Sequence, residues 1–466
     1  MQTKQPLIKS AKNVHFIGIG GIGISTIAQI LHEQGKTVTG SDMEDSDHIH
    51  HMQEEGIKIS IGHNAKNITK DHDLVIYSFA IEKDKPELAK AKELNIQCIT
   101  YPQSVGEFSK DYFTIAITGT HGKSTTTSMT ALMLLKAGLD PTVIDGTKMK
   151  ELGDKNYRLG KSKYLVVEAC EFRDAFLNYK MDILATINVD SDHLDYFGTQ
   201  EKYVQAFNNA AKKVEQNGLL IIDAEDTNSA HIQDNAKAHP VWITSNPENK
   251  FKKDYYYLEG NTLYFLEKEN NKDEYSEQSL TLKPDVPGKF NIRNSVFTAI
   301  IGLFLKIPKE KIEEGIKAFK GSWRRMELKE TNLKHAKFYD DYGHLAGEVD
   351  NTLKAIREKY PNEKILAVFQ PHQFIRIKNY LKEFGECFEA ADDVLIPDIQ
   401  RNRDTKEQMA SIQTPVLIDE IKKHKKNVFN STDIGNTANW VREHGDKYDV
   451  IVAMGSGNIK KLYKLI

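Results

Sequence analysis

The amino-acid sequence predicts an α/β protein, because short apolar strands alternate with helices along most of its 466 residues. Two strands run directly into glycine-rich turns, at residues 18–23 and 119–122, and a helix follows each turn. This succession is typical of parallel sheets that bind phosphate groups. At roughly 150 residues per domain, the length indicates about three domains. We expect a Rossmann-like domain over residues 1–109, a central P-loop domain with a parallel sheet over 110–320, and a Rossmann-like α/β domain over 321–466.

Each expected domain has its own run of strands and helices. In the first, strands are expected at residues 14–19, 37–40, 73–78 and 97–100, and helices at 24–34 and 86–94. In the second, strands are expected from residue 114 and at 164–168 and 183–188, with a small antiparallel section within 245–283 and helices near 291–305 and 309–319. In the third, strands are expected at 337–340, 365–369, 394–397 and 449–454. Ligands of open α/β sheets bind beyond the carboxyl ends of the strands, so the residues that follow these strands are the candidates for chemistry.

The composition fits a soluble globular protein, with 39% hydrophobic and 28% charged residues. A formal net charge of -3 gives no electrostatic basis for nucleic-acid binding. The three cysteines, Cys98, Cys170 and Cys387, form neither a disulfide framework nor a CxxC metal motif, which indicates a reducing compartment. The N-terminal residues lack an apolar signal core, and no apolar run approaches the roughly 20 residues of a membrane span. We therefore expect a cytoplasmic protein, monomeric or homodimeric, with no nucleic-acid or membrane partner.

The first glycine-rich turn satisfies the pattern GxGxxG through Gly18, Gly20 and Gly23, with Gly21 between them. Asp42 follows at the end of the next expected strand, a spacing known from dinucleotide-binding proteins. The glycines by themselves indicate only a diphosphate held against a helix N-terminus. An NAD molecule and a UDP-sugar both offer that diphosphate, so this turn leaves both ligands open.

The second turn carries the stronger signal, a shortened phosphate loop that reads GTHGKS from Gly119 to Ser124. The position five residues before Gly122, which is glycine in the full Walker pattern, is Ile117. Lysine at position 123 can neutralise the charge of the β- and γ-phosphates, and the Ser124 hydroxyl can ligate Mg²⁺. The sequence therefore predicts a site for a nucleoside triphosphate and Mg²⁺. Its loop residues are Gly119, Thr120, His121, Gly122, Lys123, Ser124 and Thr125.

Acidic and imidazole groups follow the next two expected strands. Glu168 ends one strand, and His193 lies just beyond the other, in the segment DSDHLD. A carboxylate and an imidazole at these strand ends would reach metal ions held at the phosphate loop. Cys170 has no evident base partner, and we assign it to packing.

Further candidates lie on a helix and in the third domain. Asn291 and Asn294 share one helix face, where their amides suit a purine edge, although Asn291 is equally suited to capping the helix. Cationic and aromatic residues gather after strands of the third domain, where forked donors suit an anionic substrate. They are Arg325, Tyr342, His344, His372, Arg376, Arg401 and Arg403.

Taken together, these motifs resemble those of the Mur ligases over essentially the whole chain. The matching segments, in order, are HFIGIGGIG, GSD, GTHGKST, VEACEFRDAFL, TINVDSDHLDYF, GKFNIRNS, WRRME, DDYGH and FQPH. The resemblance implies UDP-sugar-binding, ATP-binding and amino-acid-binding domains in that order. It also implies a ligase of peptidoglycan synthesis that uses ATP to join L-alanine to UDP-N-acetylmuramate through an acyl phosphate.

The resemblance also implies roles for individual residues. Ser124, Glu168 and His193 would hold the metal ions, Asn291 and Asn294 would meet adenine, and the first glycine turn with Ser41 and Asp42 would hold UDP. The implied catalytic residues are Lys123, Glu168, His193, Arg325 and His344. Those around the muramoyl and amino-acid groups are Arg325, Tyr342, His344, His372, Arg376 and Arg403.

Several positions depart from the family pattern. The second histidine and the proline expected after DDYGH are Leu345 and Ala346, and further departures are Phe290, Gln373 and Asn458. Most of them fall in or near the third domain, so glycine or serine remains an alternative to alanine. A ligase that attaches a preformed tripeptide and a catalytically inactive UDP-sugar-binding protein also remain open.

Overall fold

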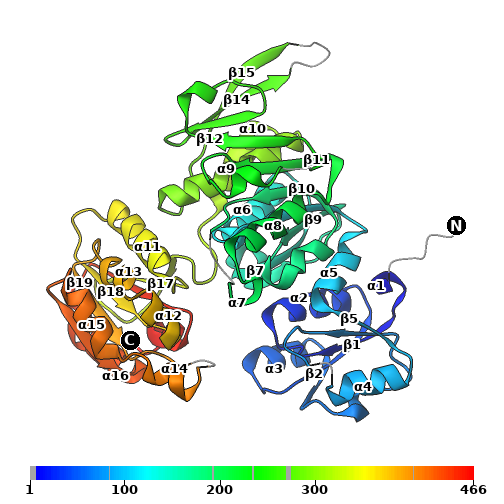
Figure 1. The fold of residues 1–466 in the computed structure, drawn as a ribbon, viewed down its shortest axis with the longest axis horizontal. Helices are drawn as coiled ribbons and strands as arrows, with labels where there is room; N and C mark the ends of the chain where they lie inside the picture. The colour runs from blue at the N-terminus through cyan, green and yellow to red at the C-terminus, as the bar shows by residue number, and fades with distance from the viewer. Residues whose placement is uncertain (1–6, 83, 191–193, 234–235, 269–273, 402–403) are drawn as a thin grey trace. The chain divides into compact units, whose positions relative to one another are not determined.

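The computed structural model describes the chain except residues 1–6, 83, 191–193, 234–235, 269–273 and 402–403. The described residues form two compact units, one of residues 1–283 and 293–319 and the other of residues 284–292 and 320–466. The first unit holds two sheets, and the second holds one (Figure 1). No helix in the described part of the chain is both long and apolar enough to cross a membrane.

The first sheet is parallel throughout, and its strand order is β3-β2-β1-β4-β5. Its strands are β1 (Asn13–Ile17), β2 (Thr37–Asp42), β3 (Lys58–Ile61), β4 (Leu74–Tyr77) and β5 (Gln97–Thr100). The accompanying helices are α1 (Leu7–Ser10), α2 (Ile22–Glu33), α3 (Asp47–Glu54), α4 (Pro86–Glu93) and α5 (Tyr101–Ser109). The order reverses between β1 and β4, which confirms the Rossmann-like prediction and places the glycine turn after β1 at the switch point.

The second sheet has the order β15-β14-β13-β12-β11-β10-β6-β9-β7-β8. Its strands are β6 (Phe113–Thr118), β7 (Thr142–Met149), β8 (Lys155–Arg158), β9 (Tyr164–Glu168), β10 (Met181–Thr186), β11 (Val214–Asp223), β12 (Pro240–Thr244), β13 (Tyr255–Glu259), β14 (Thr262–Lys268) and β15 (Tyr275–Thr281). The helices are α6 (Lys123–Lys136), α7 (Leu194–Phe197), α8 (Gln200–Ala211), α9 (Lys289–Phe304) and α10 (Lys309–Ala318). The expected antiparallel section is confirmed by the pairing of β14 with β13 and β15.

The third sheet has the order β16-β17-β21-β18-β19-β20, and only the β16–β17 pair is antiparallel among its described strands. The strands are β16 (Glu327–Lys329), β17 (Lys337–Asp341), β18 (Ile365–Phe369), β19 (Asp393–Pro397), β20 (Val428–Thr432) and β21 (Val450–Met454). The helices are α11 (Ala346–Lys359), α12 (Phe374–Asn379), α13 (Leu381–Glu386), α14 (Lys406–Ala410), α15 (Thr414–Lys422) and α16 (Ile434–His444).

Strand β18 shows why this sheet is buried on both faces. Ile365, Ala367 and Phe369 pack into one apolar cluster, whereas Leu366 and Val368 pack into another. All five side chains are fully buried. A strand covered on both faces reads as a continuous apolar run, which is the pattern that allowed residues 365–369 to be predicted as a strand.

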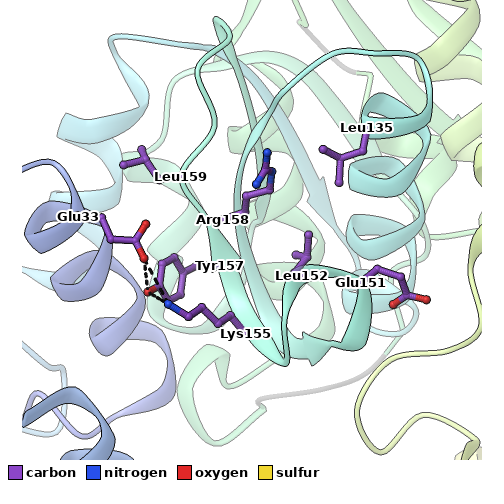
Figure 2. Close-up of a pocket in the computed structure, with 8 residues that line it drawn as sticks. All are labelled: Glu33, Leu135, Glu151, Leu152, Lys155, Tyr157, Arg158 and Leu159. Atoms are coloured by element: carbon purple, nitrogen blue, oxygen red, sulfur yellow. Dashed lines mark hydrogen bonds and ion pairs between the residues drawn. The ribbon is translucent and has the colours of Figure 1, made fainter. Parts of the chain in front are cut away.

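The two sheets of the first unit are joined by polar contacts between α2 and β8. Tyr157 donates a hydrogen bond to Glu33 (2.8 Å), and Lys155 forms ion pairs with Glu33 (3.3 Å) and Glu55 (3.0 Å). Glu33, Lys155 and Tyr157 line a pocket of about 330 Å³, shown in Figure 2. The pocket contains no residue that the sequence singled out for chemistry, and Glu33 and Lys155 already pair with each other. The polar contacts that line the pocket therefore join the two sheets, and the pocket does not coincide with the candidate site.

We expect Gly315→Ala to destabilise the first unit by about 1–3 kcal/mol, the usual range for overpacking. Gly315 of α10 packs on α6, and a Cβ atom at this position would lie 2.4 Å from the Met133 Cα atom. Backbone cannot move aside as a flexible side chain would. Thermal unfolding followed by calorimetry measures the effect.

Gly347→Ala in α11 is the matched control, because a Cβ there has no neighbour within 4 Å. That variant should be neutral or more stable by about 0.5–1 kcal/mol, the helix preference of alanine over glycine. Equal effects of the two substitutions would contradict the packing described for α10 on α6.

Candidate active site

The phosphate loop connects β6 to α6, and its glycines are sterically required. Gly119 and Gly122 have φ angles of 140° and 83°. A Cβ atom on Gly119 would lie 2.9 Å from the Asn188 carbonyl oxygen, and one on Gly122 would lie 2.7 Å from Asn294 Oδ1. The loop therefore keeps an open, concave backbone at the N-terminus of α6, the arrangement that binds phosphate.

Asn188, just after β10, holds this loop in shape. Its side chain accepts a hydrogen bond from the His121 N–H (2.8 Å) and donates one to the His121 carbonyl (3.0 Å). The Asn188 carbonyl accepts from the Thr120 N–H (3.0 Å). β10 is the sheet neighbour of β6, so the end of one strand fixes the loop that follows the other.

Lys123 is the first residue of α6, and its ammonium group folds back over the loop. It donates hydrogen bonds to the carbonyls of Gly119 and Thr120 and forms an ion pair with Glu171 (3.1 Å). Burial opposes the charged form of the lysine, but the neighbouring acidic groups, Glu171 first and then Cys170 and Glu168, together outweigh that effect and raise the pKa of Lys123. The ammonium therefore stays protonated where phosphate charge would arrive.

Glu168 ends β9, the other neighbour of β6, in register with Ile117. Its Oε2 atom accepts a hydrogen bond from the Gly146 N–H (3.0 Å), and a Cβ atom on Gly146 would lie 2.6 Å from that oxygen. Asp145 hydrogen-bonds to Glu168, and burial, followed by the charge of Glu168, raises the pKa of Asp145 well above its ordinary value. Burial and the neighbouring carboxylate thus favour the protonated form of Asp145.

These groups fit a site for Mg²⁺. Within the described ranges, no group of three or more His, Cys, Asp or Glu side chains could hold a metal ion by itself. Mg²⁺, however, is commonly held by one or two carboxylates together with substrate phosphates, and it prefers oxygen ligands. The Glu168 carboxylate and the Ser124 hydroxyl, beside a loop shaped for phosphate, supply that donor set. His193, the third predicted ligand, lies outside the described residues.

Cys170, which the sequence assigned to packing, has a thiol that burial keeps in its protonated form. Burial, together with the charge of Glu171, raises the pKa of its thiol to about 12. The thiol is therefore protonated and unreactive at neutral pH.

The two asparagines of α9 have different surroundings. Asn294 lies against Gly122 of the phosphate loop, close to where a nucleotide would enter. Asn291 donates from its side-chain amide to the Pro287 carbonyl (2.6 Å), which anchors the first turn of the helix. Both side chains are buried.

The glycine turn after β1 is fixed by β2. The N–H groups of Gly18 and Ile19 both donate to the Ser41 carbonyl (2.8 and 3.1 Å), and the Gly20 N–H donates to the Asp42 carboxylate (2.8 Å). Gly21 caps α2, and a Cβ atom on Gly23 would lie 3.0 Å from the Tyr101 ring. The turn is thus formed by backbone contacts that leave the N-terminus of α2 free of a side-chain cap.

Ser41 contributes through its backbone, because its side chain is fully buried. Its hydroxyl donates to Glu87 Oε2 (2.8 Å). The same carboxylate accepts from Asn67 (2.8 Å) and lies 3.1 Å from His63 and 3.5 Å from His15. Burial would raise the pKa of Glu87, but hydrogen bonds from His15, Asn67 and Ser41 outweigh it and lower the pKa.

In the second unit, the structure brings three of the predicted residues together. The Arg325 guanidinium lies 5.3 Å from the centre of the Tyr342 ring, and that ring lies 5.2 Å from His344 in a T-shaped arrangement. Glu348 Oε2 accepts from the His344 N–H (2.9 Å) and lies 3.2 Å from its Nδ1 atom. Arg324, next to Arg325, is instead a core residue that forms a buried ion pair with Asp340 (3.1 Å).

His372 and Arg376 lie after β18, where the sequence placed them. Burial, then the charges of Arg376 and His344, lowers the pKa of His372, so its imidazole is neutral at pH 7. Among the described residues, the buried Nδ1 atom of His372 has no hydrogen-bond partner. Arg403 lies outside the described residues, and Arg401 is exposed.

Sequence reasoning missed several residues that shape these sites. Asp145 and Gly146 lie on β7, a strand that it did not predict, and Tyr203 lies on α8, a helix that it did not predict. Glu87 and Glu348 were not assigned roles. Glu348 lies close in sequence to the DDYGH motif, whereas Glu87 lies near no motif, and neither position distinguishes these residues from ordinary surface carboxylates.

Family models match this chain in the same order as its three sheets. The Mur ligase family catalytic domain matches residues 13–113, the Mur ligase middle domain matches 117–302, and the Mur ligase glutamate ligase domain matches 324–457. The chain belongs to the Mur ligase family. Both the family prediction and the predicted α/β fold are therefore confirmed.

Similar proteins extend over nearly the full length of this Mur ligase. A UDP-N-acetylmuramate--L-alanine ligase of Caldanaerobacter subterraneus is 37% identical and aligns over 97% of this chain and 96% of its own. The enzyme of the same name from Acetivibrio thermocellus is also 37% identical, over 97% and 94% of the two chains. The crystal structure of UDP-N-acetylmuramate-alanine ligase MurC from Thermotoga maritima superposes with a TM-score of 0.75 at 26% identity, covering 97% of each chain.

We expect Glu87→Gln to destabilise this Mur ligase at pH 7 by about 2 kcal/mol, the scale of hydrogen bonds to a buried charge. Because folding lowers the pKa of Glu87, its stabilising effect is present above the ordinary value of 4.5 and is lost as the pH falls below it. The difference in unfolding midpoint between wild type and variant should therefore shrink once the pH falls below 4.5. Calorimetry from pH 7 down to about pH 3 measures this difference, and a difference that grows on acidification would contradict the assignment.

Proposed function

We propose that this Mur ligase joins L-alanine to UDP-N-acetylmuramate, with ATP as the energy source and an acyl phosphate as the intermediate. One observation carries the proposal: a phosphate loop with its lysine and Glu168 lies in the same compact unit as a glycine turn suited to a diphosphate. The names of its relatives give the substrates. NAD has no role in this proposal, because a redox cofactor would leave the phosphate loop without a purpose.

The chemistry requires two nucleotide-binding sites. A carboxylate resists attack by an amine, so the muramoyl carboxylate first attacks the γ-phosphorus of ATP, and ADP leaves. The amine of L-alanine then attacks the acyl carbon to give a tetrahedral intermediate, which collapses to the amide and releases phosphate. Charge neutralisation and in-line positioning account for most catalysis of phosphoryl transfer.

The phosphate-loop residues supply the first step. Lys123 would neutralise charge on the β- and γ-phosphates, and the loop N–H groups would bind phosphate oxygens. Ser124, Glu168 and His193 would hold Mg²⁺, which supplies further neutralisation of the phosphate oxygens. Asn294, beside Gly122, and Asn291, on the same helix, are the proposed adenine contacts.

The other substrates are assigned to the remaining domains. The glycine turn at residues 18–23, with Asp42 and the backbone of Ser41, would hold the UDP diphosphate. Residues of the third domain would bind the muramoyl carboxylate and the amino acid, with neutral His372 beside cationic Arg376. The proposed domain limits are 1–109, 110–320 and 321–466, and a reaction of this kind belongs in the cytoplasm, where ATP is available.

The altered motifs of the third domain bear on the incoming amino acid. Leu345 stands where the family has a second histidine, and it precedes α11 as the N-cap residue, with its N–H bonded to Glu348 (3.2 Å). Gln373 is the N-cap residue of α12 and has a φ angle of 64°. Because these residues adjoin His344 and His372, glycine or serine is the second candidate for the incoming amino acid.

We expect phosphate release that requires ATP, Mg²⁺, UDP-N-acetylmuramate and an amino acid together, with L-alanine the best of a panel that includes glycine, serine and L-Ala-γ-D-Glu-meso-diaminopimelate. Lys123→Ala should lower turnover by at least about 10³-fold, since one preorganised cation is worth several kcal/mol in phosphoryl transfer. A colorimetric phosphate assay measures both.

Lys136→Ala, at the far end of the same helix, is the matched control and should retain turnover. Turnover that does not depend on the sugar nucleotide would contradict the proposed reaction. Normal turnover of a folded Lys123→Ala variant would contradict the phosphate-loop assignment alone.

A further inference from the structure

The ammonium group of Lys123 has a complete set of protein partners. It donates to the Gly119 carbonyl, to the Thr120 carbonyl (3.1 Å) and to Glu171 Oε1 (3.1 Å). An ammonium group has three N–H donors, so these three acceptors use all of them. Any phosphate that binds Lys123 must therefore share or displace one of these partners.

Glu171 is the charged member of that set, and it is completely buried. Its Oε1 atom also accepts a hydrogen bond from the Tyr203 hydroxyl (3.2 Å). Its Oε2 atom is buried and accepts no hydrogen bond from any described residue. A buried carboxylate with so few partners is costly, so the ion pair with Lys123 is its main compensation.

Tyr203 extends this contact to the rest of the loop. Its hydroxyl lies 2.9 Å from the Thr120 hydroxyl, which accepts from the Asp190 N–H (2.9 Å) and lies 3.0 Å from the Asp190 carbonyl oxygen. Glu171 is thus connected to both ends of the phosphate loop and to the segment that follows β10. A group in that position can set the direction of the lysine side chain.

We propose that Glu171 is a positioning residue for phosphoryl transfer, which holds the Lys123 ammonium in place over the loop and competes with the triphosphate for it. The inference rests on the proposed function, because it takes the loop to bind ATP. The negative charge of Glu171 weakens nucleotide binding. The same contact with Glu171 keeps the Lys123 ammonium in the orientation in which it meets the transferring phosphate.

A single variant, Glu171→Gln, should bind the nucleotide more tightly but turn over more slowly. Glu171→Gln keeps the shape of the side chain and removes its charge, so the phosphates no longer compete with a carboxylate. We expect the variant to bind a non-hydrolysable ATP analogue with Mg²⁺ at least about fivefold more tightly, the effect of one charge-assisted contact. We expect its kcat to fall at least about tenfold, because a misdirected cation stabilises the transition state poorly.

Titration calorimetry gives the affinity, the phosphate assay gives kcat, and thermal unfolding confirms that the variant folds. A residue that merely supports the fold would weaken binding and turnover together. Binding by folded Glu171→Gln that is equal to or weaker than that of wild type would overturn the inference, and so would an unchanged kcat.

Tyr203→Phe is the second variant, and it keeps the inference open to refutation if Glu171→Gln does not fold. It retains the Glu171 charge but removes one donor, so the carboxylate pairs more strongly with Lys123. We expect the ATP analogue to bind about threefold more weakly, and equal or tighter binding would overturn the inference. Wild-type protein that neither binds the analogue nor releases phosphate would instead refute the proposed function, so the two failures are distinguishable.

Discussion

The adjacency of three parallel strands determines the candidate active site. β6 pairs with β9 on one side and with β10 on the other, so their carboxyl ends lie at one edge of the sheet. The phosphate loop follows the first strand, Glu168 ends the second, and Asn188 follows the third. Loss of either pairing would separate the loop from a carboxylate or from the amide that holds it. The register of this sheet is therefore the constraint on which the chemistry depends.

Close approach of neighbouring atoms explains the glycines of the phosphate-loop site. Gly119, Gly122 and Gly146 each lie where a Cβ atom would come within 3 Å of a residue placed by another strand or helix. Because glycine has no Cβ atom, the phosphate loop and β7 can pack directly against the neighbouring side chains and backbone at these positions.

Buried charge is arranged differently in the two units. In the first, Glu87 and Glu171 are fully buried carboxylates, one surrounded by hydrogen-bond donors and the other dependent on Lys123. In the second, Arg324 and Asp340 form a buried pair that stabilises the fold, while Arg325 beside it lies over Tyr342. The first arginine is thus structural, whereas the second is the one proposed to meet the substrate. Only the packing around each side chain distinguishes them.

The sequence alone determined the α/β class, the two glycine turns and the positions along the chain of strands such as β5, β9 and β18, because apolar runs and glycine spacing are local properties of the chain. It also placed Lys123 in the loop that follows one strand and Glu168 at the end of another. The tertiary structure decided which distant residues complete the sites. Asp145, Tyr203 and Glu87 reach their partners through strand pairing and helix packing across many residues of chain, and no local pattern records such contacts. It likewise turned Ser41 inward, since burial of a side chain depends on what packs over it.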